Sequence, residues 1–205
     1  MSNFEAKSPS GLTILVDADD TIHNLTDAWV GYLNDRYGTS VRRSDISDWD
    51  FSKAFPDIRR DDVYGALFDV ELWKRVKPLP GAVKYLKKLI EDGNDVYIVT
   101  ASHPGTVDMK TREAIFKHFP YLDYKHLIIT SNKQMVRGDI IIDDAPHNLG
   151  GGRLGMMMTA PHNVGVSDDR LTELNAVRVD GWKEVYELIH EYQKNKKNKK
   201  DRRGV

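Results

Sequence analysis

The sequence predicts an α/β fold: a doubly wound parallel sheet with a small helical cap inserted after the first strand. Short apolar runs alternate with amphipathic segments, polar residues follow most of the runs, and one connection is far longer than the others. Apolar runs separated by amphipathic helices are typical of a parallel sheet covered on both faces. The runs are "LTILVDA" (12–18), "DVYIVTA" (95–101), "HLIITS" (126–131), "DIIIDD" (139–144) and "GMMMTA" (155–160).

Polar side chains stand at the carboxyl ends of the first four runs. Asp17, Thr100 and Asp143 end three of them, and Thr130 with Ser131 ends the other. Ligands of open parallel sheets bind outside the carboxyl ends of the strands, so we expect these side chains to converge although they are far apart in sequence. The candidate site is therefore assembled from strand ends.

The long connection predicts an inserted cap. Residues 22–77 separate the first strand from the helix in "PGAVKYLKKLIEDGN", whereas βα connections usually have about 2–6 residues. Within this connection, residues 25–38 and 59–76 carry apolar residues at helical spacing. We therefore expect a small helical cap over the site. The other expected parts are a disordered N-terminus (1–10), an α/β core (11–21 and 78–192) and a basic flexible tail (193–205).

Composition and charge exclude several classes of protein. The 205 residues are 40% hydrophobic with a formal net charge of -1, which allows a sizeable core but gives no basic field, so nucleic acid is not an expected partner. Zero cysteines exclude disulfides, thiolate zinc sites and a thiol nucleophile. No apolar run approaches the roughly 18 residues of a membrane span, and the N-terminus lacks a signal-peptide pattern. We expect a cytoplasmic protein with no membrane partner.

Acidic residues at two strand ends predict a metal site. Asp17 and Asp19 follow the first run, and Asp143 and Asp144 end the fourth. Carboxylates buried close together repel one another and lose hydration, so a cation is expected between them. Hard oxygen ligands of this kind suit Mg²⁺. A Mg²⁺ ion held by carboxylates most often serves phosphate chemistry, and one carboxylate would then be free to attack phosphorus.

Covalent phosphate chemistry needs further groups. A second acid must protonate the departing alkoxide and later deprotonate water, and cationic and hydroxyl donors must bind the phosphoryl oxygens. Asp19 matches the acid/base, and Lys133 and Thr100 match the donors.

Four motifs, in order, resemble those of the haloacid dehalogenase-like superfamily of phosphoaspartate phosphatases. They are "DADDT" for the DxDx[TV] motif, "YIVTAS" for a hydroxyl after an apolar strand, Lys133 in "SNKQMVRGD", and "DIIIDD" for an acidic pair. The resemblance implies a Rossmann-like core in which Asp17 is the nucleophile and Asp19 the general acid/base, with Thr100 and Lys133 binding phosphate. The Mg²⁺ ligands that it implies are Asp17, the backbone carbonyl of Asp19, Asp143 and Asp144.

Within that superfamily the chain is similar to the 5'(3')-deoxyribonucleotidases over about residues 12–190. The similar segments are "ELWKRVKPLPGAVKYL", "DIIIDDAPHNL" and a final strand and helix of the type "VDGWKEVYELI". The likeness implies a deoxyribonucleoside monophosphate as substrate. Trp73, at the cap exit, is the candidate substrate-binding residue, since an aromatic ring can stack on a nucleobase. Ala101 lies in the expected phosphate-binding segment, where animal members have a second hydroxyl.

Other interpretations stay open at this point. The same chemistry could act on another small phosphomonoester, such as a sugar or cofactor phosphate. A signalling receiver domain also combines acids, a hydroxyl, Lys and Mg²⁺, although in a different motif order. Trp73 could simply anchor the cap, Asp20 is expected to cap a turn, and His103, His147 and His162 are expected in surface loops. The sequence does not determine the oligomeric state, so a homodimer stays open.

Overall fold

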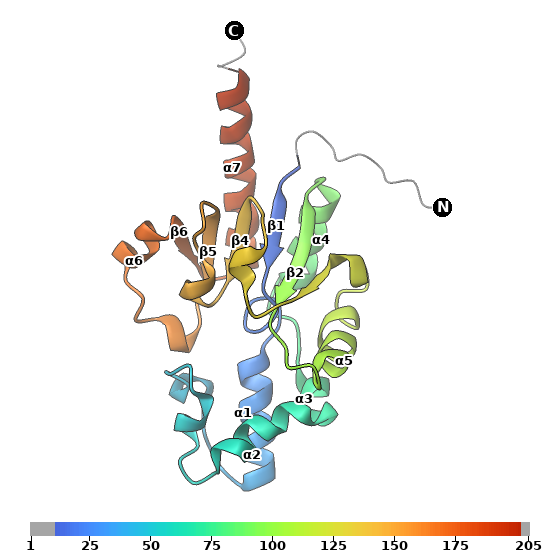
Figure 1. The fold of residues 1–205 in the computed structure, drawn as a ribbon, viewed down its shortest axis with the longest axis vertical. Helices are drawn as coiled ribbons and strands as arrows, with labels where there is room; N and C mark the ends of the chain where they lie inside the picture. Colours follow the sequence, from blue (N-terminus) through green and yellow to red (C-terminus); the bar gives the residue numbers. More distant parts are fainter. Residues whose placement is uncertain (1–10, 202–205) are drawn as a thin grey trace.

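The structure, a computed structural model, describes residues 11–201, with side chains described up to residue 196. A sheet flanked by helices forms the larger part, and a group of short helices lies beyond the carboxyl ends of the strands (Figure 1). The expected disordered N-terminus, residues 1–10, lies outside the described residues.

Within the described residues, six parallel strands form one sheet in the order β3-β2-β1-β4-β5-β6. The strands are β1 (Thr13–Val16), β2 (Asp95–Thr100), β3 (Leu127–Ile129), β4 (Ile140–Asp143), β5 (Leu154–Met158) and β6 (Ala176–Val179). The first five lie within or overlap the five apolar runs, and the sixth is the final strand that the family resemblance implies. The predicted parallel α/β fold is confirmed.

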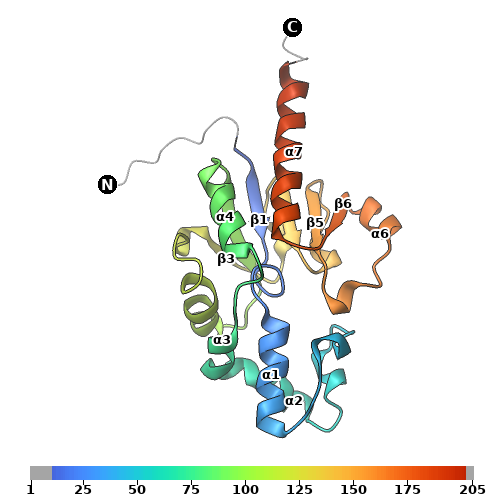
Figure 2. The same ribbon diagram turned by 180° about the vertical axis from the view of Figure 1, so that it is seen from behind.

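Helices cover both faces of this sheet. The core helices are α4 (Ala82–Glu91), α5 (Val107–Met109), the π-helix Lys110–Phe116, α6 (Asp168–Glu173) and α7 (Trp182–Asp201). Ile14 packs in the cluster that holds the apolar side chains of α4 and α7, and these two helices lie side by side across one face (Figure 2). Its neighbour Leu15 packs on the opposite face with Leu171 of α6. Alternate strand residues thus enter different clusters, as the pleat of a strand requires.

The order of the strands reverses beside β1. This strand pairs with β2 on one side and with β4 on the other, although β2 and β3 both precede β4 in sequence. Such a reversal leaves space for a ligand at the carboxyl ends of the two neighbouring strands. Asp17 directly follows β1 and Asp143 ends β4, so the topology brings the first and fourth motifs together.

The cap consists of short helices between β1 and α4. They are α1 (Leu25–Tyr37), α2 (Arg60–Gly65) and α3 (Val70–Arg75), with 3₁₀ turns at Arg43–Asp45, Phe51–Ala54 and Ala66–Phe68. The helical pattern predicted over residues 59–76 is divided into separate helices. The break falls at Asp69, which is extended and whose carboxylate accepts a hydrogen bond from Glu71 N to cap α3.

Two adjoining segments connect the cap to the core. The backbone N–H of Asn24 donates to the carbonyl of Lys77 at 2.9 Å, and the N–H of Lys77 donates to Asn24 Oδ1 at 2.7 Å. One step closer to the sheet, the N–H of Leu79 donates to the carbonyl of Ile22 at 2.9 Å. The two chain segments that join the cap to the core are therefore hydrogen-bonded to each other.

Residues 193–205 were expected to form a basic flexible tail. In the structure α7 continues past that boundary as far as Asp201 and contacts the core at two described side chains. Gln193 donates to Asn94 Oδ1 at 2.7 Å, and Lys196 pairs with Asp139 at 2.9 Å. Residues 202–205 lie outside the described residues. No described helix combines the length and apolar character that crossing a membrane requires.

Candidate active site

Three carboxylates and one ammonium group meet at the carboxyl ends of β1 and β4. One oxygen from each of Asp17, Asp143 and Asp144 lies within 4.8 Å of the other two, and all three residues are buried. Lys133 Nζ lies 2.6 Å from Asp17 Oδ1 and 2.7 Å from Asp143 Oδ2. The structure therefore brings four of the predicted site residues into one cluster.

The negative charge of this cluster exceeds its positive charge. Burial raises the pKa of Asp143 to about 7, and repulsion from Asp17 acts in the same direction. Burial also raises the pKa of Asp144 to about 6. Burial alone would lower the pKa of Lys133, but attraction to Asp17 and Asp143 outweighs it and raises that pKa. One ammonium group among three buried carboxylates leaves the cluster with excess negative charge, which a divalent cation would neutralise.

The donor set fits Mg²⁺. Its three buried groups are all carboxylates, the hard oxygen ligands that this ion prefers. Asp17 Oδ1 accepts no hydrogen bond from the described residues, despite its contact with Lys133. Asp143 is oriented by hydrogen bonds from Ala145 N at 2.9 Å and Asn148 Nδ2 at 3.0 Å, both to Oδ1. Such outer partners are the usual means of fixing a metal-binding carboxylate.

A second polar network surrounds Asp19. Lys110 Nζ donates to Asp19 Oδ2 at 2.6 Å, to Thr100 Oγ1 at 2.7 Å and to the carbonyl of Ala101 at 2.9 Å. His23 Nε2 lies 2.8 Å from Asp19 Oδ1. Burial alone would raise the pKa of Asp19, but attraction to Lys110 and the hydrogen bond with His23 outweigh it and hold the pKa below its ordinary value. The network joins the loop after β1 to the end of β2, where two of the predicted phosphate binders lie.

Lys110 is a site residue that the sequence analysis missed. It is only 1% exposed and begins the π-helix, an element often found at functional sites. The sequence alone gives little signal for Lys110, because the burial of its segment, as at Ala114 four residues later, is evident only in the structure. A lysine on a buried face is rarely found without a partner.

Trp73 does not reach this site. It is 2% exposed in the apolar core of the cap, and its Nε1 donates to the carbonyl of Leu67 at 2.8 Å. Its ring centroid is 6.0 Å from Lys110 Nζ, so it lies behind the network rather than in the cavity. A ring buried to this extent cannot stack on a substrate base. The substrate-binding role expected for Trp73 is therefore wrong, and the alternative of a packing role holds.

A cavity of about 310 Å³ opens beside the predicted catalytic residues. Its volume is at the lower end of the range for small-molecule sites. Core residues of its lining are Asp17, Asp19, Asp20, Asp144, Ala145, His147, Asn148 and His162, and cap residues are Leu25, Thr26, Trp29, Ile46, Asp48, Trp49, Phe51 and Tyr64. Trp49 is 51% exposed there, and its ring centroid lies 4.3 Å from that of His162 and 5.8 Å from that of His147. The cap thus supplies an accessible aromatic ring, but from a different residue than expected.

Two of the histidines expected in surface loops belong to the site. His147 and His162 both line the cavity, and the half-buried His162 has its Nε2 2.6 Å from Asp144 Oδ2. Both follow strand ends, the same signal that identified the carboxylates. His103 is exposed, as expected. Asp20 caps a turn as expected: it has a φ of 50°, and its carboxylate accepts hydrogen bonds from the backbone N–H and the hydroxyl of Thr26.

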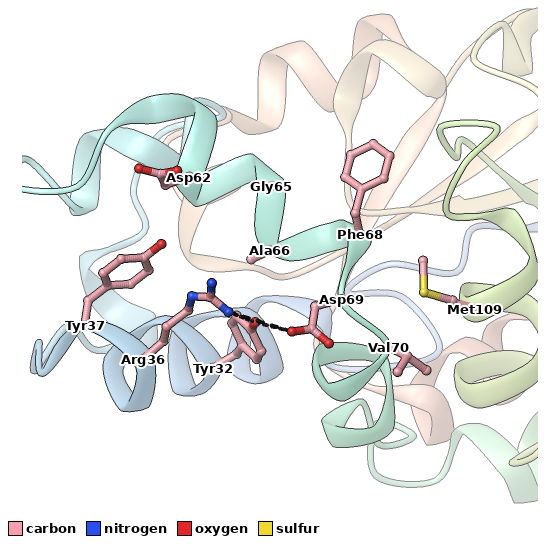
Figure 3. A pocket seen from close by; sticks show the side chains of 10 residues that line it. All are labelled: Tyr32, Arg36, Tyr37, Asp62, Gly65, Ala66, Phe68, Asp69, Val70 and Met109. Atoms are coloured by element: carbon pink, nitrogen blue, oxygen red, sulfur yellow. Dashed lines mark hydrogen bonds and ion pairs between the residues drawn. The ribbon is translucent and has the colours of Figure 1, made fainter.

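A larger cavity, about 500 Å³, lies elsewhere in the cap (Figure 3). Its lining includes Tyr32 and Arg36 of α1, Asp69, and Met109 of α5. Arg36 donates to the hydroxyl of Tyr32 at 2.8 Å, and that hydroxyl donates to Asp69 at 2.5 Å. None of the predicted catalytic residues lines it. The smaller cavity is therefore the one that adjoins the chemistry.

Comparison with known proteins identifies relatives over most of the chain. Residues 11–196 match the family model described as "5' nucleotidase, deoxy (Pyrimidine), cytosolic type C protein". A 5'(3')-deoxyribonucleotidase of Bacillus subtilis (strain 168) is 29% identical over 175 residues, covering 84% of this chain and 95% of that protein. A 5'(3')-deoxyribonucleotidase of Clostridium acetobutylicum is 31% identical over 137 residues, covering 67% of this chain and 75% of that protein.

Solved structures share the fold. A HAD family hydrolase from Deinococcus radiodurans R1, with bound phosphate and sodium, superposes with a TM-score of 0.57 at 18% identity, covering 90% of this chain and 97% of that one. A haloacid dehalogenase-like hydrolase from Streptococcus pneumoniae gives a TM-score of 0.58 at 14% identity, covering 89% and 100%. At these identities the likeness concerns the fold alone.

Proposed function

The chain belongs to the family of 5' nucleotidase, deoxy (pyrimidine), cytosolic type C proteins, and from this premise we propose that it is a magnesium-dependent phosphatase of deoxyribonucleoside monophosphates that acts through a phosphoaspartate. Membership of this family, within the haloacid dehalogenase-like fold, makes it a phosphomonoester hydrolase. The observation that carries the mechanism is the convergence of Asp17, Lys133, Asp143 and Asp144 at the ends of β1 and β4.

Asp17 is the nucleophile in this mechanism. Its carboxylate oxygen forms a bond to phosphorus as the bond to the nucleoside oxygen breaks, and Asp19 gives a proton to that departing oxygen. Asp19 then takes a proton from the water that attacks phosphorus, which releases inorganic phosphate and restores the Asp17 carboxylate. Lys133, already 2.6 Å from Asp17 Oδ1, neutralises phosphoryl oxygens during both steps.

Asp19 has to change its protonation state during this cycle. In the free enzyme Lys110 and His23 favour its carboxylate form, which is the form that acts as a base in the second step. A dianionic phosphate bound nearby would raise the pKa of Asp19, since a like charge disfavours the ionised form. We therefore expect the substrate itself to promote the protonation that the first step requires.

Mg²⁺ would be held by Asp17, Asp143, Asp144 and the backbone carbonyl of Asp19. When bound it would lower the repulsion between an anionic nucleophile and an anionic substrate. The cavity beside these residues accounts for the rest of the substrate. It is lined by the rings of Trp29, Trp49, Phe51 and Tyr64, and aromatic walls of this kind suit a nucleobase.

The test is phosphate release from a panel of monophosphates, with Mg²⁺ and with a chelator. The panel contains deoxyribonucleoside and ribonucleoside 5'- and 3'-monophosphates, sugar phosphates and p-nitrophenyl phosphate. We expect release to require Mg²⁺ and to be fastest for deoxyribonucleotides. A preference for sugar phosphates would overturn the nucleotide assignment while leaving the phosphatase chemistry intact, and release that is unaffected by chelation would overturn the metal requirement.

Asp19→Asn is expected to slow substrates with poor leaving groups more than activated ones. Proton donation matters most when the departing alkoxide is basic, and a general acid contributes about 10²–10⁴-fold. The phosphoryl-transfer step should therefore fall by at least about 10²-fold for a nucleotide but much less for p-nitrophenyl phosphate. Single-turnover measurements isolate that step. Equal losses for both substrates would rule out Asp19 as the general acid.

Trp49→Ala is expected to raise KM for nucleotides by the equivalent of about 1–3 kcal/mol, the worth of one base–aromatic stack. Measured at saturating Mg²⁺, a minimal phosphate ester that lacks a base should be unaffected. Trp73→Ala is the matched control: because Trp73 is buried in the cap, its removal should lower the free energy of unfolding by about 3–5 kcal/mol. Comparable changes in KM for both esters in Trp49→Ala would show that Trp49 does not contact the base.

A further inference from the structure

We propose that His162 is a positioning residue that holds Asp144 in its metal-binding orientation and at the same time supports Trp49 of the cap, so that Mg²⁺ binding and seating of the cap are coupled. The inference rests on the magnesium site of the proposed function. It concerns a residue outside the four motifs, on the turn that follows β5.

The turn that carries His162 is rigidly held by its neighbour Asn163. This residue is 0% exposed. Its Nδ2 donates to the carbonyl of Asp144 at 2.8 Å and to the carbonyl of Met158 at 2.8 Å, while its Oδ1 accepts from Ala160 N at 3.1 Å. One side chain thus ties the turn to the end of β5 and to the backbone of the acidic pair.

Arg178 of β6 braces the same turn from the other side. Its Nη1 donates to Asn163 Oδ1 at 3.0 Å, and its Nη2 donates to the carbonyls of Asn163 at 3.2 Å and Val166 at 2.9 Å. Charge-assisted hydrogen bonds of this kind are stronger than neutral ones. The core therefore fixes the backbone of the turn that carries His162, while the orientation of the His162 ring depends on the ring's own contacts.

His162, on this fixed turn, holds the carboxylate of Asp144 in place. Its Nε2 is 2.6 Å from Asp144 Oδ2, and the two side chains are only 7% and 10% exposed. Asp144 is thus held through its carboxylate by His162 and through its backbone by Asn163. Partners that orient a metal ligand are worth about 10–100-fold in metal affinity.

The same imidazole ring also meets the cap. The ring of Trp49 lies 4.3 Å from it between centroids, at an interplanar angle of 58°. Nearby, the cap turn Arg43–Asp45 is in contact with the turn Pro161–Asn163. The ring of His162 therefore has Asp144 on its polar edge and Trp49 against it, and any rotation of the ring would disturb both contacts.

This arrangement links two equilibria, the binding of Mg²⁺ at Asp144 and the seating of Trp49 against His162. If a seated Trp49 favours the His162 orientation that holds Asp144, then Mg²⁺ bound to Asp144 must favour a seated Trp49 by the same factor, because linkage is reciprocal. The cavity beside Asp17 would then be completed by the cap only when the metal site is filled. An exposed histidine, His190 of α7, forms a similar pair with Asp92 at 3.1 Å but does not line the cavity, so it offers a comparison for the histidine–carboxylate contact.

The first experiment measures Mg²⁺ affinity without nucleotide, by calorimetric titration of the full chain. Relative to wild type, His162→Ala should raise the Mg²⁺ dissociation constant about 10–100-fold. His162→Gln, whose amide can donate from nearly the same place as Nε2, should recover a large part of the affinity. His190→Ala is the matched control and should bind Mg²⁺ like wild type, because His190 is exposed and pairs with Asp92 outside the site. Circular dichroism checks that each variant is folded.

The second experiment uses Trp49 as its own reporter. Of the four tryptophans, all within the described residues, Trp29, Trp73 and Trp182 are buried and Trp49 is 51% exposed. Quenching of the tryptophan fluorescence by acrylamide therefore reports mainly on Trp49, and Trp49→Phe supplies the background. Mg²⁺ should decrease the quenching in wild type, and saturating Mg²⁺ should leave it unchanged in His162→Ala.

The outcomes separate this inference from the proposed function. If wild-type protein binds Mg²⁺ and folded His162→Ala binds it within twofold of wild type, the positioning role alone is overturned. The same follows if His162→Gln binds Mg²⁺ no better than His162→Ala. Quenching that responds equally to Mg²⁺ in wild type and His162→Ala would overturn the coupling. A wild-type protein that binds no Mg²⁺ would overturn the metal site and this inference together.

Discussion

Asp17→Asn is expected to abolish phosphate release while the protein stays folded. The amide is a far poorer nucleophile than the carboxylate, and the substitution also removes one of the three converging carboxylates. Loss of a covalent nucleophile usually costs several orders of magnitude in turnover. The fold should survive, because Lys133 keeps its contact with Asp143 at 2.7 Å and the change removes negative charge from a crowded cluster.

Phosphate release and circular dichroism on the same sample measure this expectation. Asp35→Asn is the matched control, since Asp35 is an exposed carboxylate that pairs with Arg75 on the cap surface; its activity should equal that of wild type. An Asp17→Asn variant that retains more than about 1% of wild-type activity would not be compatible with a covalent nucleophile at this position.

The fold was predictable because the inner strands β1, β2, β4 and β5 are largely buried on both faces. A strand such as β4, "IIID", is a continuous apolar run whose register follows from its neighbours. The strand-end carboxylates were predictable for the same reason, since parallel strands carry their next residues to one edge of the sheet. The break between α2 and α3 was harder to predict, because Asp69 interrupts a segment, residues 59–76, whose apolar spacing is otherwise helical.

The side-chain partners in the site could not be derived from the motifs. Lys110 is 91 residues from Asp19 in sequence, and only the packing of the π-helix against the end of β2 brings them together. Likewise, the sequence shows two tryptophans in the cap's later segments, Trp49 and Trp73, and nothing in their composition decides which is exposed. Tertiary packing decided it: Trp73 fills the cap core, whereas Trp49 lies over the histidines of the core.

Lys133→Met is expected to lower kcat/KM about 10³-fold, because the variant loses a donor to the transferring phosphoryl group and the cation beside the nucleophile. In the free protein it should also lower stability by about 3 kcal/mol, since removing one partner of a buried ion pair leaves the others uncompensated. Lys133 is buried, and its ammonium lies 2.6 Å from Asp17 and 2.7 Å from Asp143. Without it, three carboxylates would face one another.

The Lys133→Met variant is also expected to respond more strongly to Mg²⁺ than wild type. A divalent cation would replace the missing positive charge, so Mg²⁺ should raise the Tm of Lys133→Met more than that of wild type, while activity stays low because the phosphoryl donor is still absent. Lys87→Met is the matched control: Lys87 is exposed and pairs with Glu91 at 3.5 Å, an interaction worth about 0–1 kcal/mol. The test measures the Tm of both variants and wild type with and without Mg²⁺, together with their kcat/KM. If Lys133→Met keeps more than about a tenth of wild-type kcat/KM, or if Mg²⁺ shifts its Tm no more than that of wild type, then Lys133 does not supply the charge that this site requires.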